Sequence, residues 1–200
     1  MPKVSTCLWF GTEAEAAIRL YTSLVPDSRI DHVQRSPGDW PGGRAGDAIL
    51  VAFTLGGQSF QALNGGTPAQ YGTAASLSVL CSDQAEVDRL WSALTADGGA
   101  EIMCGWLRDR WGVPWQIVPE ILPRLLAHPD PAVSGRVFAA MQQMVKLDIA
   151  GLERTRLEAA DWIAVAAGHT FLMNHPDAIE ATLAFLAHGR FPDHLRSPLP

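Results

Sequence analysis

The sequence predicts an α+β protein made of two βαβββ modules, which form a curved mixed sheet and are followed by C-terminal helices. The main observation is an internal repeat. A shift of 70 residues aligns the first helical pattern with a later one, matching Thr12, Ala17, Tyr21 and Leu24 to Ser82, Val87, Trp91 and Leu94. A shift of 55 residues aligns two hairpins, matching Gly57, Phe60 and Gln61 to Gly112, Trp115 and Gln116.

The first module begins with the apolar run Cys7 to Phe10, which predicts a strand. Thr12 and Glu15 have the spacing of a capping box, and apolar residues at helical spacing then predict a helix that stops before Pro26. Three strands are expected over 30–35, 48–55 and 59–63, with the Gly56-Gly57 pair as the hairpin signal between the last two.

The second module begins at Ser76 and repeats this order up to Pro119. A short helix over 121–126 and a longer one from Val133 to near Lys146 are expected after it. We therefore predict a first domain over 1–156, with modules at about 1–66 and 74–119 and helices over 120–156. Residues 157–200 are expected to be a C-terminal appendage.

Composition and charge narrow the classes of partner. The formal net charge is -6 and the pI is about 5.4, and no Lys/Arg cluster appears, so nucleic acid is not expected. Three cysteines without C-x-x-C spacing favour a reducing compartment, so we expect a cytoplasmic protein. No apolar stretch has the length of a membrane span, so no membrane partner is expected.

Two modules side by side are expected to enclose a small-molecule cleft. By the repeat, Thr6 and Ser76 on the first strands and Gln61 and Gln116 on the last strands should face it. Tryptophans are more often core than ligand platforms, and Asp109 with its arginine neighbours is typical of a solvated hairpin tip. The predicted ligand-binding residues are Trp9, Phe53, Gln61, Asn64, Ser76, Trp106, Trp115 and Gln116.

Several segments together resemble the vicinal oxygen chelate superfamily, which contains glyoxalases, dioxygenases and bleomycin-resistance proteins. The closer resemblance is to its PhnB-like subgroup, whose domain is named after 3-demethylubiquinone-9 3-methyltransferase. The segments that carry it are 8–10, 53–58, 62–66, 104–109, 115–119 and 146–149. The resemblance implies the glyoxalase-like fold and a homodimer.

In metal-dependent members of the superfamily, His and Glu ligands hold a divalent ion at positions that correspond here to Thr6, Gln61, Ser76 and Gln116. Amides and hydroxyls are poor substitutes for those ligands, so we expect no metal, no cofactor and no catalytic residue. No glycine-rich turn typical of an S-adenosylmethionine site is present either. The expected function is metal-free binding of an unknown small molecule. The alternative is a lyase, dioxygenase or methyltransferase-type enzyme that uses an unrecognised metal or cofactor site.

Residues 160–187 weakly resemble the C-terminal end of an α/β-hydrolase, with His169 at the position of the catalytic histidine. A catalytic triad also needs a nucleophile on a G-x-S-x-G turn, and the sequence contains no such motif. Hydrolase activity is therefore not expected.

Overall fold

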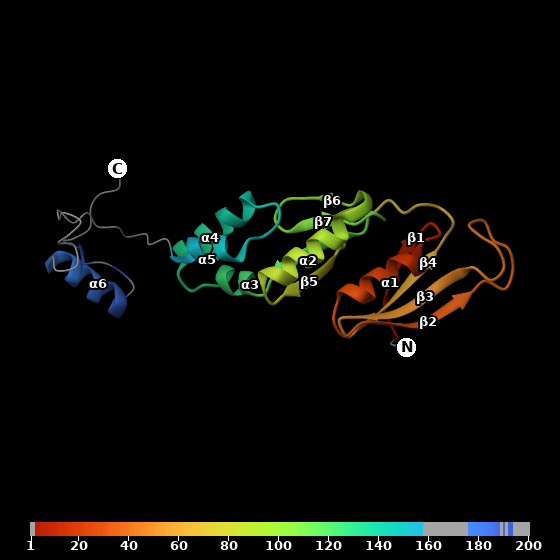
Figure 1. Cartoon of the computed structure of the whole chain (residues 1–200), viewed down its shortest axis with the longest axis horizontal. Helices are drawn as coiled ribbons and strands as arrows, with labels where there is room; N and C mark the ends of the chain where they lie inside the picture. Colours follow the sequence, from red (N-terminus) through yellow and green to blue (C-terminus); the bar gives the residue numbers. More distant parts are fainter. Residues whose placement is uncertain (1–2, 158–175, 189, 191, 194–200) are drawn as a thin grey trace. The chain divides into compact units, whose positions relative to one another are not determined.

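The computed structural model describes residues 3–157, 176–188, 190, 192 and 193 (Figure 1). The chain divides into two compact units. The first contains Met1–Glu120 and Gln143–Leu147, and the second contains Ile121–Gln142 and Asp148–Pro200. The two βαβββ modules both lie in the first unit, and each module forms a four-stranded mixed sheet of its own. The predicted fold class is confirmed.

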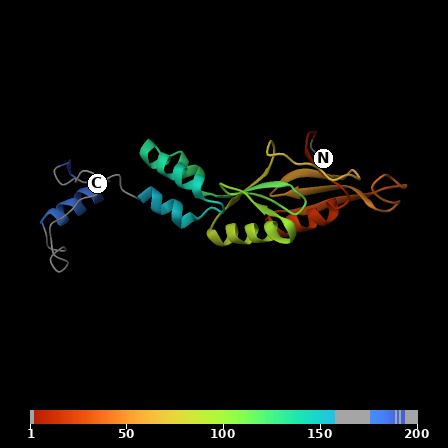
Figure 2. The ribbon, with the colours of Figure 1, turned by 90° about the horizontal axis from the view of Figure 1, so that it is seen from above.

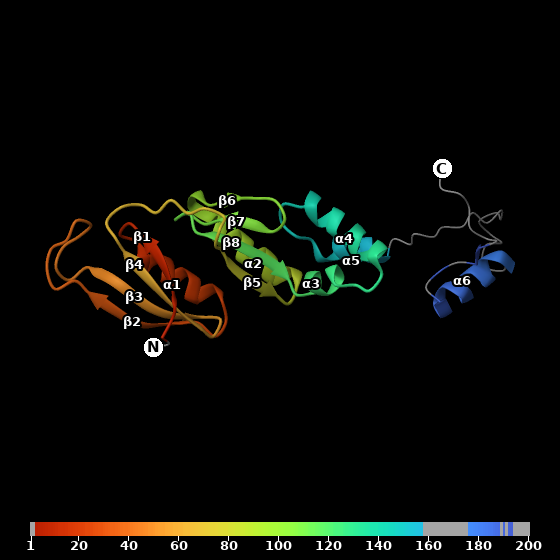
Figure 3. The same cartoon turned by 180° about the vertical axis from the view of Figure 1, so that it is seen from behind.

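The first module contains β1 (Thr6–Phe10), α1 (Ala14–Leu24), β2 (Arg29–Arg35), β3 (Ala48–Leu55) and β4 (Gln58–Asn64). The strand order is β1-β4-β3-β2, with β1 parallel to β4 and the other pairs antiparallel. Residues Ala14, Ala17, Ile18 and Tyr21 form the buried stripe of α1. The helix covers one face of the sheet, as Figure 2 shows from above, and Figure 3 looks onto the opposite, open face.

The second module contains β5 (Leu77–Cys81), α2 (Gln84–Thr95), β6 (Ala100–Glu101), β7 (Trp106–Arg108) and β8 (Pro114–Pro119). Its strand order, β5-β8-β7-β6, has the same pattern as that of the first module. The β6 and β7 strands are shorter than their counterparts, with two and three residues. The repeat in the sequence therefore corresponds to a repeat in the structure.

The first helix is capped differently from the sequence prediction. The capping box expected from Thr12 and Glu15 is wrong, because the N-cap residue is Glu13 and no side chain caps the helix from that position. Instead the backbone N–H of Ala14 donates to Oδ1 of Asn64, at the end of β4, over 2.9 Å. In α2, by contrast, the N-cap residue Asp83 accepts from the backbone N–H of Glu86.

The strand register corrects one position of the expected cleft. Thr6 pairs with Phe60, whereas the neighbour of Gln61 on β1 is Cys7. Paired residues project from the same face of a sheet and successive residues from opposite faces, so Thr6 and Gln61 do not share a face. The expectation that they do is wrong. Ser5 immediately precedes β1 and lies two residues from Cys7, so by strand alternation the two are on the same face. Ser5 corresponds to Ser76 in the second module.

A buried carboxylate joins the two modules. Asp109, which is 3% exposed, accepts hydrogen bonds from the Tyr21 hydroxyl of α1 and from Trp115 Nε1 over 3.0 Å. The backbone N–H groups of Trp111 and Val113 donate to its other oxygen. Burial raises the pKa of Asp109, while these four donors oppose the shift. The expectation of a solvated hairpin tip is therefore wrong for Asp109.

The second unit contains the helices α3 (Ile121–Leu126), α4 (Pro131–Gln143), α5 (Ile149–Leu157) and α6 (Pro176–His188). The α3 and α4 helices correspond to two that the sequence predicts, and α5 falls almost entirely within residues 120–156, where helices are expected. The apolar run 162–166 and His169 of the hydrolase-like segment lie outside the described residues. The unit boundary after Glu120 differs from the predicted division at residue 156, which stays a prediction. No helix within the described ranges is long and apolar enough to cross a bilayer.

Candidate ligand-binding site

The open face of the first sheet carries a row of side chains from neighbouring strands. Cys7, Gln61 and Ala52 are paired across β1, β4 and β3, and His32 of β2 pairs with Ala52. Because paired residues share a face, these side chains lie on the side of the sheet away from α1. Burial raises the pKa of the Cys7 thiol, so this side chain is a neutral thiol at pH 7.

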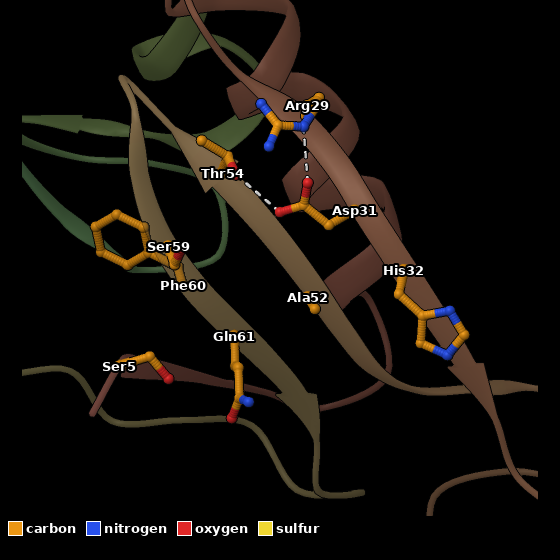
Figure 4. Close-up of a pocket in the computed structure, with 9 residues that line it drawn as sticks. All are labelled: Ser5, Arg29, Asp31, His32, Ala52, Thr54, Ser59, Phe60 and Gln61. Atoms are coloured by element: carbon orange, nitrogen blue, oxygen red, sulfur yellow. Dashed lines mark hydrogen bonds and ion pairs between the residues drawn. The ribbon is translucent and has the colours of Figure 1, made fainter. Parts of the chain in front are cut away.

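A pocket of about 260 Å³ lies on this face (Figure 4). Two residues of β3 line it, Ala52 in the middle of the view and Thr54 beside Arg29, and they are 8% and 6% exposed. Gln61 lines one end, and Arg29 lines the other, as Figure 4 shows. The remaining lining residues are Ser5, Asp31, His32, Ser59 and Phe60. The lining thus combines hydrogen-bonding side chains with a small apolar floor at Ala52.

A bulge in β2 places Asp31 and His32 beside this pocket. The register runs from Ile30 opposite Phe53 directly to His32 opposite Ala52, so Asp31 is an extra residue in β2. An extra residue breaks the alternation of a strand and re-aims its side chains. Asp31 and His32 therefore both line the pocket although they are adjacent in sequence. In a regular strand, two adjacent residues would project from opposite faces of the sheet.

The second module has a related group on its sheet. Gln116 pairs with Ser78 of β5 and with Trp106 of β7, so these three share one face. Gln116 Nε2 donates to the Ser76 hydroxyl over 2.7 Å. The structure thus brings three predicted site residues together, namely Ser76, Trp106 and Gln116. Gln61 lies on the other sheet, with the first pocket.

The comparisons with known proteins agree with this architecture. A sequence model for the family described as 3-demethylubiquinone-9 3-methyltransferase matches residues 2–118, more than half of the chain. The chain belongs to this family. The PhnB protein from Bacillus cereus is 34% identical with a TM-score of 0.52, and the match covers 59% of this chain and 99% of that one.

Other solved structures match this PhnB-like chain over a similar share of its length. A protein from Staphylococcus aureus is 33% identical, with a TM-score of 0.28 and coverage of 60% of this chain and 98% of that chain. A glyoxalase/bleomycin resistance protein from Albidiferax ferrireducens T118 is 17% identical, with a TM-score of 0.39, and the match covers 60% and 99% of the two chains. No curated protein matches the sequence. The resemblance to the PhnB-like subgroup is confirmed.

The other predicted site residues of this PhnB-like protein lie in different surroundings. Phe53 and Trp115 are fully buried, Phe53 stacked on Phe60 and Trp115 packed edge-on against Tyr21. Asn64 is 3% exposed, and its amide also donates to the backbone oxygen of Ala48. These three side chains have clear roles in packing and hydrogen bonding within the fold. Their contacts with a ligand stay predictions.

Trp9 lies at a separate hollow. It is 41% exposed, and its Nε1 donates to the backbone oxygen of Thr67 over 2.9 Å. Trp9, Arg110 and Trp111 line a second pocket of about 300 Å³. Trp9 is therefore accessible to a ligand, but it lines a different pocket from Gln61.

The pocket residues that the sequence reasoning missed are Ser5, Arg29, Asp31, His32, Ala52, Thr54 and Ser59. Thr54 lies two residues from Ala52, and Ser59 lies two residues from Gln61. Strand alternation alone would therefore have predicted that they share a face with Ala52 and Gln61. Within the described part of the chain, no group of three or more His, Cys, Asp or Glu side chains is arranged to hold a metal ion. The site offers amide, hydroxyl and guanidinium groups for hydrogen bonding.

Proposed function

We propose that this PhnB-like protein binds a small organic molecule, without a metal, in the pocket around Gln61 on the open face of its first sheet. The supporting observation is the pocket itself, which combines a small floor at Ala52 with hydrogen-bonding groups at its rim. Ligand sites commonly have this mixture of an apolar surface and a few placed polar groups. At about 260 Å³ the pocket suits a molecule smaller than most drugs.

The chemistry of Gln61 supports the metal-free part of the proposal. The superfamily resemblance places Gln61 and Gln116 at metal-ligand positions, and both are neutral amides. Divalent cations such as Mg²⁺ and Mn²⁺ bind preferentially to carboxylate and imidazole ligands, which balance or share their charge. Asp31 contributes a carboxylate to the pocket lining, but this carboxylate is already engaged by Arg29 and Thr54. An amide in this position serves better as a donor and acceptor for an organic ligand.

A fragment screen followed by two-dimensional amide NMR tests the proposal. We expect binders to perturb the amide signals of 52–54 and 59–61. The Ala52→Leu variant fills the floor and should weaken such binding about tenfold or more, because overpacking excludes the ligand. Gln61→Ala should weaken it about fivefold, the value of one lost hydrogen bond. Gln34→Ala, an exposed glutamine of β2 outside the pocket lining, is the matched control.

Two results would contradict this assignment. If binders respond to Gln116→Ala and not to Ala52→Leu, the ligand site lies on the second sheet. If purified protein holds a stoichiometric divalent ion that is lost in Gln61→Ala, the metal-free proposal is wrong. Including S-adenosylmethionine in the screen tests the methyltransferase alternative directly, since that activity requires the protein to bind it.

We also propose a homodimer. β5 is an edge strand of the second sheet, and its Leu80 is 56% exposed. An exposed apolar side chain on an open edge favours association with another chain. Light scattering is expected to give about twice the chain mass of 21.6 kDa, and Leu80→Lys should shift the mass towards the monomer. A monomeric wild-type protein would contradict the proposal.

A further inference from the structure

We infer that the ligand of this pocket carries a carboxylate group, which Arg29 binds through its terminal guanidinium nitrogens. The inference rests on the proposed function, because it names the chemical class of ligand for the same pocket. It comes from three side chains that the sequence reasoning did not connect, namely Arg29, Asp31 and Thr54. Figure 4 shows them together at the end of the pocket away from Gln61.

Asp31 holds the arginine in one orientation. Its Oδ1 lies 2.8 Å from Arg29 Nε, and its Oδ2 accepts a hydrogen bond from the Thr54 hydroxyl over 2.8 Å. Thr54 is 6% exposed and belongs to the central strand β3, so it fixes the carboxylate to a rigid part of the sheet. Both oxygens of Asp31 are therefore engaged by the protein itself. Asp31 is a positioning residue for Arg29.

The remaining donors of Arg29 suit a carboxylate. Asp31 engages the guanidinium at Nε, which leaves the two terminal nitrogens as a fork for a second partner. A planar fork of N–H donors matches the two oxygens of a carboxylate. The Arg29 side chain is 69% exposed, so a ligand can reach it without displacing the protein. A lysine would lack both the planar fork and the fixed orientation.

The rest of the pocket sets the size and shape of the ligand body. Ala52 provides a shallow apolar floor between Arg29 and Gln61. The Gln61 amide at the far end is a donor and an acceptor for a polar substituent. A single ring with a carboxylate at one end fits a volume of about 260 Å³. We therefore expect small planar organic acids to bind in preference to their neutral analogues.

Benzoate and benzamide are the matched probes, because they share size and shape and differ in charge. Each is titrated into the full chain while the amide signals of residues 29–32, 52–54 and 59–61 are followed by NMR. Benzoate is expected to bind about five- to tenfold more tightly than benzamide, since solvent weakens an ion pair at an exposed arginine. Arg29→Gln should reduce benzoate binding to the level of benzamide.

Two further variants separate the role of Arg29 from general charge effects. Arg35→Gln removes another exposed arginine of the same strand, which pairs with Glu15, and it should leave the preference for benzoate unchanged. Thr54→Val keeps the shape and charge of the pocket and frees one oxygen of Asp31. It should lower the preference for benzoate without changing benzamide binding, because only the orientation of Arg29 is lost.

The outcomes distinguish this inference from the proposed function. If both probes bind the pocket equally, or Arg29→Gln leaves the preference intact, the inference is overturned and the small-molecule site stands. If neither probe binds while neutral fragments perturb the pocket signals, the inference is overturned and the proposed function still stands. If no fragment of any charge perturbs these signals, the proposed function fails and the inference fails with it.

Discussion

Replacing Asp109 by alanine is expected to lower the free energy of unfolding by about 3–5 kcal/mol, because buried hydrogen-bond donors left without an acceptor cost about 1–3 kcal/mol each. The substitution leaves the Tyr21 hydroxyl and Trp115 Nε1 without their acceptor inside the core, together with two backbone N–H groups. Urea unfolding followed by tryptophan fluorescence measures the effect, because Trp111 and Trp115 lie beside the substituted residue.

The matched control is Asp97→Ala. Asp97 is 68% exposed and pairs with Arg110 over 2.6 Å at the surface, so its loss should cost less than about 1 kcal/mol. Equal losses in the two variants would contradict the structural role of Asp109. Tyr21→Phe adds a second test. It should cost about 1–2 kcal/mol in the wild type and almost nothing in the Asp109→Ala background, because the acceptor is already gone.

Gly105→Ala is expected to lower the free energy of unfolding by about 2–4 kcal/mol. Gly105 has a φ of 79° and follows Cys104, whose φ is 62°, in a tight turn closed by the Trp106 N–H to Met103 oxygen bond. A side chain in this left-handed region costs about 1–2 kcal/mol. A Cβ would also lie 2.9 Å from the backbone oxygen of Ile117, which cannot yield without moving β8.

Gly57→Ala isolates the crowding from the backbone strain. Gly57 has the same φ of 79°, but no atom lies within 4 Å of the Cβ that alanine would add. We therefore expect Gly57→Ala to cost only the strain of about 1–2 kcal/mol. Thermal and urea unfolding of both variants measure the difference. Equal costs would mean that the turn at Gly105 shifts to relieve the contact with Ile117.

The turn at Gly105 also explains why residues 143–147 belong to the first unit. The N–H groups of Cys104 and Gly105 donate to the backbone oxygens of Met144 and Val145 over 2.7 and 2.8 Å. These bonds attach the segment to the second module, where Leu147 is buried. Residues 104–109 and 146–149 both belong to the segments that carry the family resemblance. Their contact in space was not evident from their separate positions in the sequence.

The candidate site was less predictable than the fold. Gln61 lies on the open face of the first sheet, whereas Thr6 was expected to share that face and does not, because the register of β1 against β4 is set by pairing between distant segments. Asp31 and His32 were missed because a bulge changes their direction relative to regular alternation. Arg29 became a candidate site residue only because it pairs with Asp31, which in turn accepts a hydrogen bond from Thr54 on the neighbouring strand.

Local sequence signals were enough to predict the two βαβββ modules and the approximate limits of the helix and strands in the first of them. Hydrophobic periodicity and turn residues are local signals, and each of them occurs in both modules because the modules repeat. Which side chains meet is visible only in the folded protein: Asp109 in the core between the modules, Asn64 at the start of α1, and Arg29 in the same pocket as Gln61. Those encounters depend on register, bulges and burial, which arise when segments far apart in the chain pack together.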